Sequence, residues 1–419
     1  MNFDFHDAKY GPLKKCQISN ADDLEMVIDL GHQPLCDSLL EVDQLDLPEK
    51  NYPLRLLRSK SLGHGQIDYV VPSDEVYFPE YPYRPGITRE VLIHHGERVE
   101  EAIKKLNINK GSLVVDIGSN DGTLLLEYKK KGMKVLGVEP TNMAQYAQSV
   151  GIDSIQEFFD ESSAEKILSK HGNPKIITAT NVFAHMSTLG KVMRGIDLLM
   201  NNDSYFVFEN HYIMNILNEN QYDSIYHEHI RSYSLKSIVY LFELYQMKVI
   251  DAEVVDRYGG TLRVVVSKNM NLESSQNVKN YLILENERGL LNKPIWSSFA
   301  KNVIKTKNQL MELALDAANK NLRFVGKSCP GRSSTLINYV GLNKALMPYI
   351  TEQSTSLKLG KFLPGKHIPI VDDEVLFREQ PDYVIIFAWH YGNEIIKILK
   401  NKGLKSKFVL PLPFLKIID

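Results

Sequence analysis

The run Leu113-Val114-Val115-Asp116-Ile117-Gly118-Ser119-Asn120-Asp121-Gly122-Thr123 decides how the middle of the chain folds. Its first five residues have the length and apolar character of a strand buried in a parallel sheet. A loop with two glycines follows, and the next segment, 124–131, is expected to be helical. A strand, a glycine turn and a helix in this order predict the opening of a βαβ unit.

The alternation of strands and helices continues on both sides of this run. A long amphipathic helix is predicted at 88–106, followed by strands at 113–117, 135–138, 153–156, 176–179 and 205–209, with a helix at 143–149. A polar helical stretch, 274–321, precedes a second alternation, with strands at 322–325, 383–388 and 407–410 and helices at 334–340 and 394–400. Strands that alternate with helices favour doubly wound sheets, so the predicted fold class is α/β.

The first 88 residues do not follow this alternation. They are rich in Pro, Tyr and turn residues, with short extended runs such as 26–30 and 66–71. This composition predicts a small loop-rich β module. A length of 419 residues suits about three domains. We therefore divide the chain into an N-terminal module at 1–88, a core with a doubly wound sheet at 89–273 and a C-terminal α/β domain with connecting helices at 274–419.

Composition excludes several classes of protein. The 49 Lys and Arg against 51 Asp and Glu leave a formal charge of -2, so there is no global attraction to nucleic acid. No apolar run approaches the roughly 18 residues that span a bilayer, and the first residues lack the features of a signal peptide. The three cysteines, Cys16, Cys36 and Cys329, are too few for a disulfide framework or a thiolate zinc site. We expect a cytoplasmic protein without nucleic-acid or membrane partners, and its oligomeric state stays open.

The glycine loop has the features of a nucleotide site. Its glycines allow a ligand close to the backbone, and the following helix N-terminus offers free N–H groups. The dinucleotide fingerprint G-x-G-x-x-G is absent, because Asn120 stands in the middle position and Asp121 where a pyrophosphate would crowd. Glu139, at the end of the next strand, stands where an acid binds both hydroxyls of a ribose. A ribose without a pyrophosphate favours S-adenosylmethionine over NAD, and the alternative is a turn that binds nothing.

The cofactor-binding candidates follow from this interpretation. Phe158, after the third strand, either covers an adenine ring or packs in the core. Asn181 ends the fourth strand, at the edge where open α/β sheets bind ligands. The full set is Asp116, Gly118, Ser119, Asn120, Asp121, Gly122, Glu139, Phe158 and Asn181.

Histidine and tyrosine gather in the stretch 209–229, which contains His211, His227 and His229 among the twelve histidines of the chain. His185 follows the fourth strand. Histidine is the side chain best suited to proton transfer near neutral pH, so we favour acid–base chemistry at this cluster. A metal site, solvated loop residues and a structural hydrogen-bond network stay open as alternatives, although the i, i+4 histidine pair of a zinc helix is missing.

A set of further motifs is spread along nearly the whole chain. They lie at 31–35, 81–86, 116–123, 181–185, 209–212, 221–229, 259–263, 326–327, 338–339 and 363–369. The run Gln221-Tyr222-Asp223-Ser224-Ile225-Tyr226-His227-Glu228-His229 is the longest and most specific. Together the motifs resemble the S-adenosylmethionine-dependent sugar C-methyltransferases. The resemblance implies a small zinc-binding module, a Rossmann-like methyltransferase core and a C-terminal α/β domain.

The resemblance also implies a mechanism. Members of this family methylate C3 of a nucleotide-linked 4-keto-6-deoxy sugar, after a base has removed the proton next to the ketone. By analogy His229 is the base. The residues that orient the base and sugar or stabilise the enolate are Tyr226, Glu228, His185, Tyr83 and Tyr81. The residues implied for the substrate are Asn210, His211, Tyr222, Tyr258, Arg263, Lys327, Lys366 and His367, although Arg263 is equally compatible with a structural ion pair.

The N-terminal module departs from the family pattern. Relatives usually carry two C-x-x-C pairs, whereas the first reads Cys16-Gln17-Ile18-Ser19 here and the second falls at 58–61, without cysteine. One thiolate does not hold a structural zinc ion, so we expect no metal. Tyr258 stands where relatives often have His, and Pro85 where they often have Ser, which affects the choice of sugar. The alternatives are O- or N-methylation of another sugar-like substrate and a non-catalytic binding protein.

Overall fold

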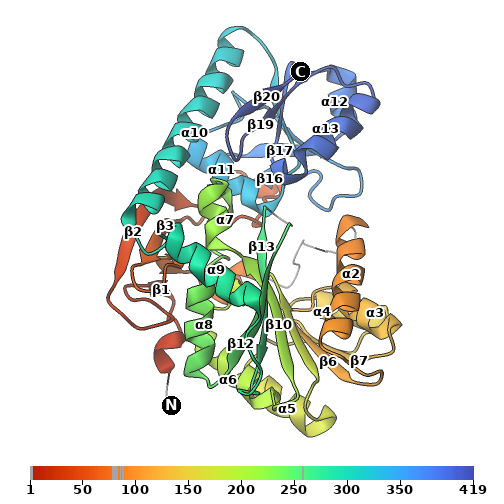
Figure 1. Ribbon diagram of the computed structural model, residues 1–419. Helices are drawn as coiled ribbons and strands as arrows, with labels where there is room; N and C mark the ends of the chain where they lie inside the picture. The colour runs from red at the N-terminus through yellow and green to blue at the C-terminus, as the bar shows by residue number, and fades with distance from the viewer. Residues whose placement is uncertain (1–2, 78–83, 85, 87–88, 257–258) are drawn as a thin grey trace.

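The computed structural model of the chain describes residues 3–77, 84, 86, 89–256 and 259–419. Three sheets of four or more strands follow one another along these residues, and a two-stranded sheet accompanies the first. Figure 1 shows the N-terminal elements beside helix α8 (Leu235–Leu244) and the C-terminal sheet at the opposite end of the molecule. The long helix α10 (Lys293–Asn319) connects these two regions along one side and contacts both β2 (Leu24–Gln33) and β14 (Phe324–Lys327).

The N-terminal sheet is antiparallel, as expected of a loop-rich β module. Its strand order is β11-β4-β3-β2, with β3 at Tyr52–Ser59 and β4 at Gly65–Ile67. Strand β11 (Arg231–Ser232) comes from the middle of the chain and pairs with β4, which joins the module to the core. The remaining elements before the core are β1 (Gly11–Pro12), β5 (Tyr69–Val70), α1 (Ser73–Val76) and the 3-10 turns η1 (Asp4–His6) and η2 (Val42–Gln44).

The core sheet has seven strands in the order β12-β13-β10-β9-β6-β7-β8. The parallel strands are β6 (Leu113–Ile117), β7 (Lys134–Val138), β8 (Ser154–Ile155), β9 (Ile176–Thr180) and β10 (Tyr205–His211). The hairpin β12 (Lys248–Val255) and β13 (Thr261–Ser267) adds an antiparallel edge. The chain proceeds outward on opposite sides of β6 and β9, so the sheet has its switch point between these two strands.

The three core helices that the sequence predicts, at 88–106, 124–131 and 143–149, are present as α2 (Arg89–Lys105), α3 (Thr123–Lys130) and α4 (Met143–Ser149). The sequence did not predict α5 (Glu161–His171), α6 (Leu189–Leu199), α7 (Ile213–Asn218) and α8, or the 3-10 turns η4 (Phe183–His185) and η5 (Tyr222–Ser224). Gly122 precedes α3 with a φ of +76°, and a Cβ there would lie 3.2 Å from Ala147 and Ile152. This tight turn holds the glycine loop against the sheet.

The C-terminal part is a second doubly wound unit. After α9 (Gln276–Glu287) and α10, its sheet has the order β16-β17-β15-β14-β18-β19-β20. The remaining elements are β15 (Ile350–Glu352), β16 (Phe362–Leu363), β17 (Ile368–Asp372), β18 (Tyr383–Ile386), β19 (Lys407–Leu410), β20 (Lys416–Ile418), α11 (Gly331–Val340), α12 (Glu374–Glu379), α13 (Gly392–Asn401) and η6 (Trp389–Tyr391). Its switch point lies between β14 and β18.

The predicted α/β fold class is confirmed in the core and in the C-terminal part. The parallel strands at the centre of each sheet are almost wholly buried, as their apolar sequences predict. Among the helices of the described residues, none has both the length and the apolar character needed to cross a bilayer.

Candidate active site

A pocket with a volume of about 560 Å³ lies between the two switch points. The glycine loop after β6 and the residues after β9 form one side, and the residues after β14 and β18 form the other. The N-terminal module contributes Asp37, Ser73 and Tyr77. Open α/β sheets bind ligands beyond the carboxyl ends of their strands at such switch points, so this pocket is positioned to bind two ligands side by side.

The core side of the pocket carries most of the residues predicted for the cofactor. Gly118, Ser119, Asn120 and Asn181 line it, together with Glu139. The Glu139 carboxylate accepts hydrogen bonds from the Asn120 amide at 2.9 Å and from the amide and hydroxyl of the nearby Thr141. The acid is therefore fixed next to the glycine loop, where the sequence places the ribose.

Two polar atoms on this side have no partner among the described residues. They are the buried Ser119 Oγ and Asn181 Oδ1. A buried polar atom without a hydrogen bond is costly, so a pocket that keeps two of them is suited to a polar ligand. Gly118 has a φ of +69°, and a Cβ there would lie 2.6 Å from Val182, so only glycine allows the loop to pack this closely on Val182. These residues fit S-adenosylmethionine, which combines a ribose with a polar amino-acid group.

Four of the other cofactor candidates differ in position. Asp116 lines the pocket and accepts a hydrogen bond from Thr178 Oγ1 at 2.6 Å, and burial raises its pKa to about 7. Phe158 lies at the rim and is 52% exposed. Asp121 and Gly122 do not line the pocket, because Asp121 turns back to bond the amide and hydroxyl of Thr123 and Gly122 packs behind the loop. They shape the turn instead of facing the ligand.

His229 lies at the centre of the aromatic cluster. Its Nδ1 donates a hydrogen bond to the Ser224 carbonyl at 2.6 Å, which leaves Nε2 as the basic nitrogen of the neutral ring. The ring centroid lies 4.0 Å from that of Tyr226, 4.6 Å from His211 and 4.8 Å from His185. Burial lowers the pKa of His229 to about 4, so the ring is neutral at pH 7. All four rings line the pocket.

His185 is held from two sides. Its Nδ1 lies 2.9 Å from the hydroxyl of Tyr77 and 4.0 Å from the carboxylate of Glu228, and both residues line the pocket. Burial lowers the pKa of His185, so it is also neutral. Tyr77 was missed by the sequence analysis, which chose Tyr81 and Tyr83 from the same tyrosine-rich segment. Tyr81, Tyr83 and the substrate candidate Tyr258 lie outside the described residues.

Several residues expected at the substrate do not reach this pocket. Asn210 is buried and accepts a hydrogen bond from the Ala184 amide, and Tyr222 packs against Tyr339 in the interior. Lys327 is paired with Asp373, His367 with Glu49, and Lys366 is also absent from the residues that line the pocket. Of the substrate candidates that the structure describes, His211 alone lines it.

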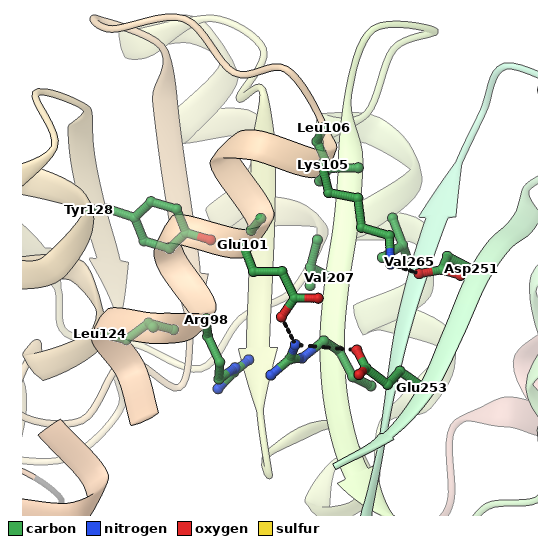
Figure 2. A pocket seen from close by; sticks show the side chains of 12 residues that line it. Arg98, Glu101, Lys105, Leu106, Leu124, Tyr128, Val207, Asp251, Glu253 and Val265 are labelled. Carbon is green, nitrogen blue, oxygen red and sulfur yellow. Dashed lines mark hydrogen bonds and ion pairs between the residues drawn. The ribbon is translucent and has the colours of Figure 1, made fainter. Parts of the chain in front are cut away.

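Arg263 forms a structural ion pair, which was the alternative to a role in substrate binding. It lies directly opposite Glu209 in the β10–β13 ladder and pairs with that carboxylate at 2.7 Å. Glu101 and Glu253 also pair with this guanidinium, at 2.7 and 3.6 Å. Figure 2 shows these two carboxylates at a small neighbouring cavity of about 30 Å³. Because three carboxylates surround it there, Arg263 does not bind a ligand of the large pocket.

The C-terminal side of the pocket was not predicted. Its lining residues are Ser328, Cys329, Pro330, Gly331, Arg332, Glu352, Gln353, Ser356, Leu357, Lys358, Ala388, His390 and Tyr391. Lys358 donates to Asp37 at 3.1 Å and to the Cys329 carbonyl at 2.9 Å. Burial alone would lower the pKa of Lys358, but the carboxylate of Asp37 raises it, so the ammonium stays charged. A cation therefore lies between the first and last parts of the chain.

The residues of the N-terminal module do not fit a zinc ion. Cys16 Sγ lies 3.8 Å from His64 Nε2, and the Ser19 amide donates to the same sulfur. At 58–61, where the second C-x-x-C pair would fall, Ser59 and the amide and hydroxyl of Ser61 donate hydrogen bonds to Asp23 instead. A structural zinc site needs four thiolate or imidazole ligands in most cases. The part of the chain that the structure describes contains no group of three or more potential ligands.

Three family models match consecutive parts of the chain. A "Methyltransferase domain" matches residues 92–252, a "C-methyltransferase C-terminal domain" 256–413 and a "Putative zinc binding domain" 16–77. The C-methyltransferase NovU of Streptomyces niveus is 29% identical over 414 residues, which are 97% of each protein. The fold, the pocket and these matches define an S-adenosylmethionine-dependent methyltransferase.

More particularly, these matches make the chain similar over nearly its whole length to the sugar C-methyltransferases that its motifs resemble, and its cofactor is S-adenosylmethionine. The match to the zinc-binding model does not extend to the ligands, so the absence of zinc stays a prediction.

Two solved structures each cover less than half of this chain. The PH0226 protein from Pyrococcus horikoshii OT3 is 14% identical, covers 45% of this chain and 96% of its own, and has a TM-score of 0.35. Magnesium protoporphyrin IX methyltransferase from Synechocystis PCC 6803, with bound S-adenosylmethionine, is 12% identical over 42% of this chain and 80% of its own, with a TM-score of 0.31. Both scores lie below 0.5, so neither structure says anything further about this chain.

Proposed function

We propose that this C-methyltransferase acts on the carbon next to the ketone, C3, of a nucleotide-linked 4-keto-6-deoxy sugar, and that His229 is the base. The observation that carries the proposal is the bond from His229 Nδ1 to the Ser224 carbonyl. It leaves the unprotonated Nε2 available in a ring that lines the same pocket as the glycine loop. A neutral base beside the cofactor is what carbon methylation through an enolate requires.

The first step is removal of a proton. A hydrogen on the carbon next to a ketone is acidic because its removal gives an enolate. His229 accepts this proton at Nε2, and its low pKa keeps the ring in the basic form at neutral pH. When bound, S-adenosylmethionine supplies an electrophilic methyl group. The two walls of the pocket would bring the reacting carbon close to the bound cofactor, which would contribute to the rate by proximity.

The neighbours of His229 stabilise the enolate and orient the sugar. Burial raises the pKa of Tyr226, so its hydroxyl stays protonated and can donate to the enolate oxygen. Tyr77 and Glu228 hold the ring of His185 on the other side of His229. Fixed donors of this kind act without reorganisation when charge develops.

The nucleotide of the substrate lies, in this proposal, on the C-terminal side of the pocket. The loops after β14 and β18 meet there at a switch point. Pro330 and Gly331 line the same region at the N-terminus of α11, whose free N–H groups would attract the negatively charged diphosphate. The sugar would then extend from this side toward His229.

The two alternatives are less well supported. Methylation of oxygen or nitrogen needs no enolate, and the matched models and the relative are those of C-methyltransferases. A non-catalytic binding protein is set aside because the chain is a methyltransferase by its family.

Proton exchange in heavy water tests the base directly. The wild-type protein, mixed with the keto-sugar in D2O, is expected to exchange the C3 hydrogen, measured by NMR. His229→Ala is expected to slow this exchange by about 100-fold or more, as for loss of a general base. His227→Ala is the matched control, because His227 Nε2 bonds the Pro53 carbonyl outside the pocket. Normal methyl transfer by His229→Ala would contradict the assignment of the base.

A further inference from the structure

Asp223 is bound by the C-terminal part of the chain. Its two carboxylate oxygens accept hydrogen bonds from Arg332 Nε at 2.8 Å and Nη2 at 2.7 Å, and from Trp389 Nε1 at 2.8 Å. The guanidinium also lies 5.4 Å from the centre of the Trp389 ring. Asp223, Arg332 and Trp389 are all buried. Three donor atoms from the C-terminal part therefore bind one carboxylate of the core.

The two donor residues come from opposite sides of one switch point. Arg332 lies in the first turn of α11, after β14, and Trp389 begins η6, after β18. Asp223 lies in η5, so residues that follow both central strands of the C-terminal sheet bind this short turn. A bidentate guanidinium and a rigid indole fix position and orientation, as well as adding energy.

The turn that is held in this way carries the acceptor of His229. Ser224 directly follows Asp223, and its carbonyl accepts the Nδ1–H of His229 at 2.6 Å. The turn is also closed locally, because the amide and hydroxyl of Ser224 both donate to the Gln221 carbonyl. Arg332 Nη2 reaches the Gln221 side chain at 3.3 Å. Movement of the turn would therefore change the acceptor that selects the tautomer of the ring.

We propose that Asp223, Arg332 and Trp389 are positioning residues that hold the Ser224 carbonyl and thereby fix the tautomer and orientation of His229. This inference rests on the proposed role of His229 as the base. It gives the C-terminal part a task in catalysis that is separate from its lining of the pocket. His229 therefore keeps the tautomer and orientation of a base only while the C-terminal part is packed on the η5 turn.

The charge of Arg332 acts in the same direction as its hydrogen bonds. Burial is the main reason why the pKa of His229 is low, and the nearby guanidinium lowers it further. The same charge contributes to the lowered pKa of His211. Arg332 therefore favours the unprotonated ring, while its bonds to Asp223 fix which nitrogen holds the remaining proton.

Nitrogen NMR of labelled histidine tests this inference without reference to turnover. The wild-type protein is expected to show His229 as a single neutral Nδ1–H tautomer. Asp223→Asn and Arg332→Lys, which keep size but lose the bidentate pair, are expected to give a mixture of tautomers. Their kcat for C3–H exchange should fall roughly 100-fold with little change in KM, since a base displaced by about 1 Å loses that much.

The matched control is Arg58→Lys. Arg58 is a buried arginine that bonds Glu25 at 2.8 and 2.6 Å in the N-terminal module, and neither residue lines the pocket. This variant should lose stability but keep the His229 tautomer and the exchange rate. Thermal unfolding of every variant separates a folding defect from a positioning defect, and Arg332→Lys is the milder substitution if Asp223→Asn folds poorly.

The results separate this inference from the proposed function. An unchanged Nδ1–H tautomer and a wild-type exchange rate in both variants would overturn the positioning role, and so would an Nε2–H tautomer in the wild type. A wild-type protein that exchanges no C3 hydrogen, with a tautomer that still responds to the variants, would overturn His229 as the base and uphold the positioning of its ring.

Discussion

The two sides of the pocket have the same architecture but treat their polar groups differently. Each is the switch point of a doubly wound sheet. On the core side, Ser119 Oγ and Asn181 Oδ1 are buried without a partner among the described residues. On the C-terminal side, Arg332 is committed to Asp223 and Lys358 to Asp37. The core side keeps polar atoms available for a ligand, whereas on the C-terminal side these charged groups form ion pairs between distant parts of the chain.

This difference has a physical consequence. A buried polar atom without a partner costs about 1–3 kcal/mol, and a ligand that supplies the missing bond recovers that energy on binding. A paired group contributes to the stability and rigidity of the free protein instead. Substitutions on the core side should therefore affect cofactor affinity, and substitutions on the C-terminal side should affect stability and the base.

A lower pH acts on the buried histidines of the stretch 209–229, in the pocket and beside it, and is expected to have the largest effect. Burial lowers the pKa of both His227 and His229 to about 4, from 6.5 in an exposed histidine. The unfolded chain takes up protons near pH 6.5 and the folded chain only near pH 4. The free energy of unfolding should therefore fall as the pH drops from about 6.5 toward 4. Urea titrations at about pH 7.5 and 5 measure it, and equal values would contradict these pKa shifts.

Gly118→Ala should weaken cofactor binding by roughly 100-fold, because the loop must move by a large fraction of 1 Å to relieve the contact with Val182. Calorimetric titration with S-adenosylmethionine measures the change. Gly111→Ala is the control, since Gly111 has a φ of +81° but nothing within 4 Å of an added Cβ. It shares the backbone strain without the contact, so a similar loss of affinity in both variants would exclude a specific role for the glycine loop.

Trp389→Phe removes one donor from Asp223 on the C-terminal side. It should lower the free energy of unfolding by about 1–3 kcal/mol, because a buried carboxylate loses a partner. The affinity for S-adenosylmethionine should not change. Urea unfolding and calorimetry on the same sample check both parts, and a weaker affinity with unchanged stability would reverse the comparison.

Ser119→Ala is the counterpart on the core side. Its hydroxyl is buried without a partner among the described residues, so its removal should not lower the free energy of unfolding and should raise it by up to about 1–3 kcal/mol. The affinity for S-adenosylmethionine should fall by about 2- to 10-fold, the value of one hydrogen bond. Loss of stability without loss of affinity would show that this oxygen serves the fold.

The smallest effect is expected in the N-terminal module, where Asp23 accepts hydrogen bonds from Ser59 and Ser61 within the region that matches the putative zinc binding domain. A strong chelator should leave the Tm unchanged, because no metal contributes to folding. Metal analysis of the purified protein completes the test. Close to one zinc ion per chain, or a large fall in Tm, would contradict the prediction.

Local sequence patterns predicted the core well because its strands and turns are determined locally. The apolar run 113–117 became β6, and the glycines after it take the positive φ values that a close turn needs. The stretch 209–229 was expected to carry acid–base residues, and the structure brings His211, Tyr226, Glu228 and His229 from it into the pocket.

The C-terminal side was not predictable because its position depends on docking between distant segments. Arg332 meets Asp223 across 109 positions, and Lys358 meets Asp37 across 321. For the same reason, motif residues such as Arg263 and Lys327 were assigned to the substrate, although each is neutralised by a carboxylate from a neighbouring element. A cation in a motif indicates a ligand only when no carboxylate of the fold is close to it.

The structure of the methylated product tests the central claim most directly. Purified protein, S-adenosylmethionine labelled with 13C in the methyl group and a nucleotide-linked 4-keto-6-deoxy sugar are combined, and the product is examined by NMR. We expect the labelled methyl group on C3, where its carbon couples to C3 and the C3 hydrogen of the starting sugar is gone. A methyl group bound to oxygen or nitrogen would contradict it.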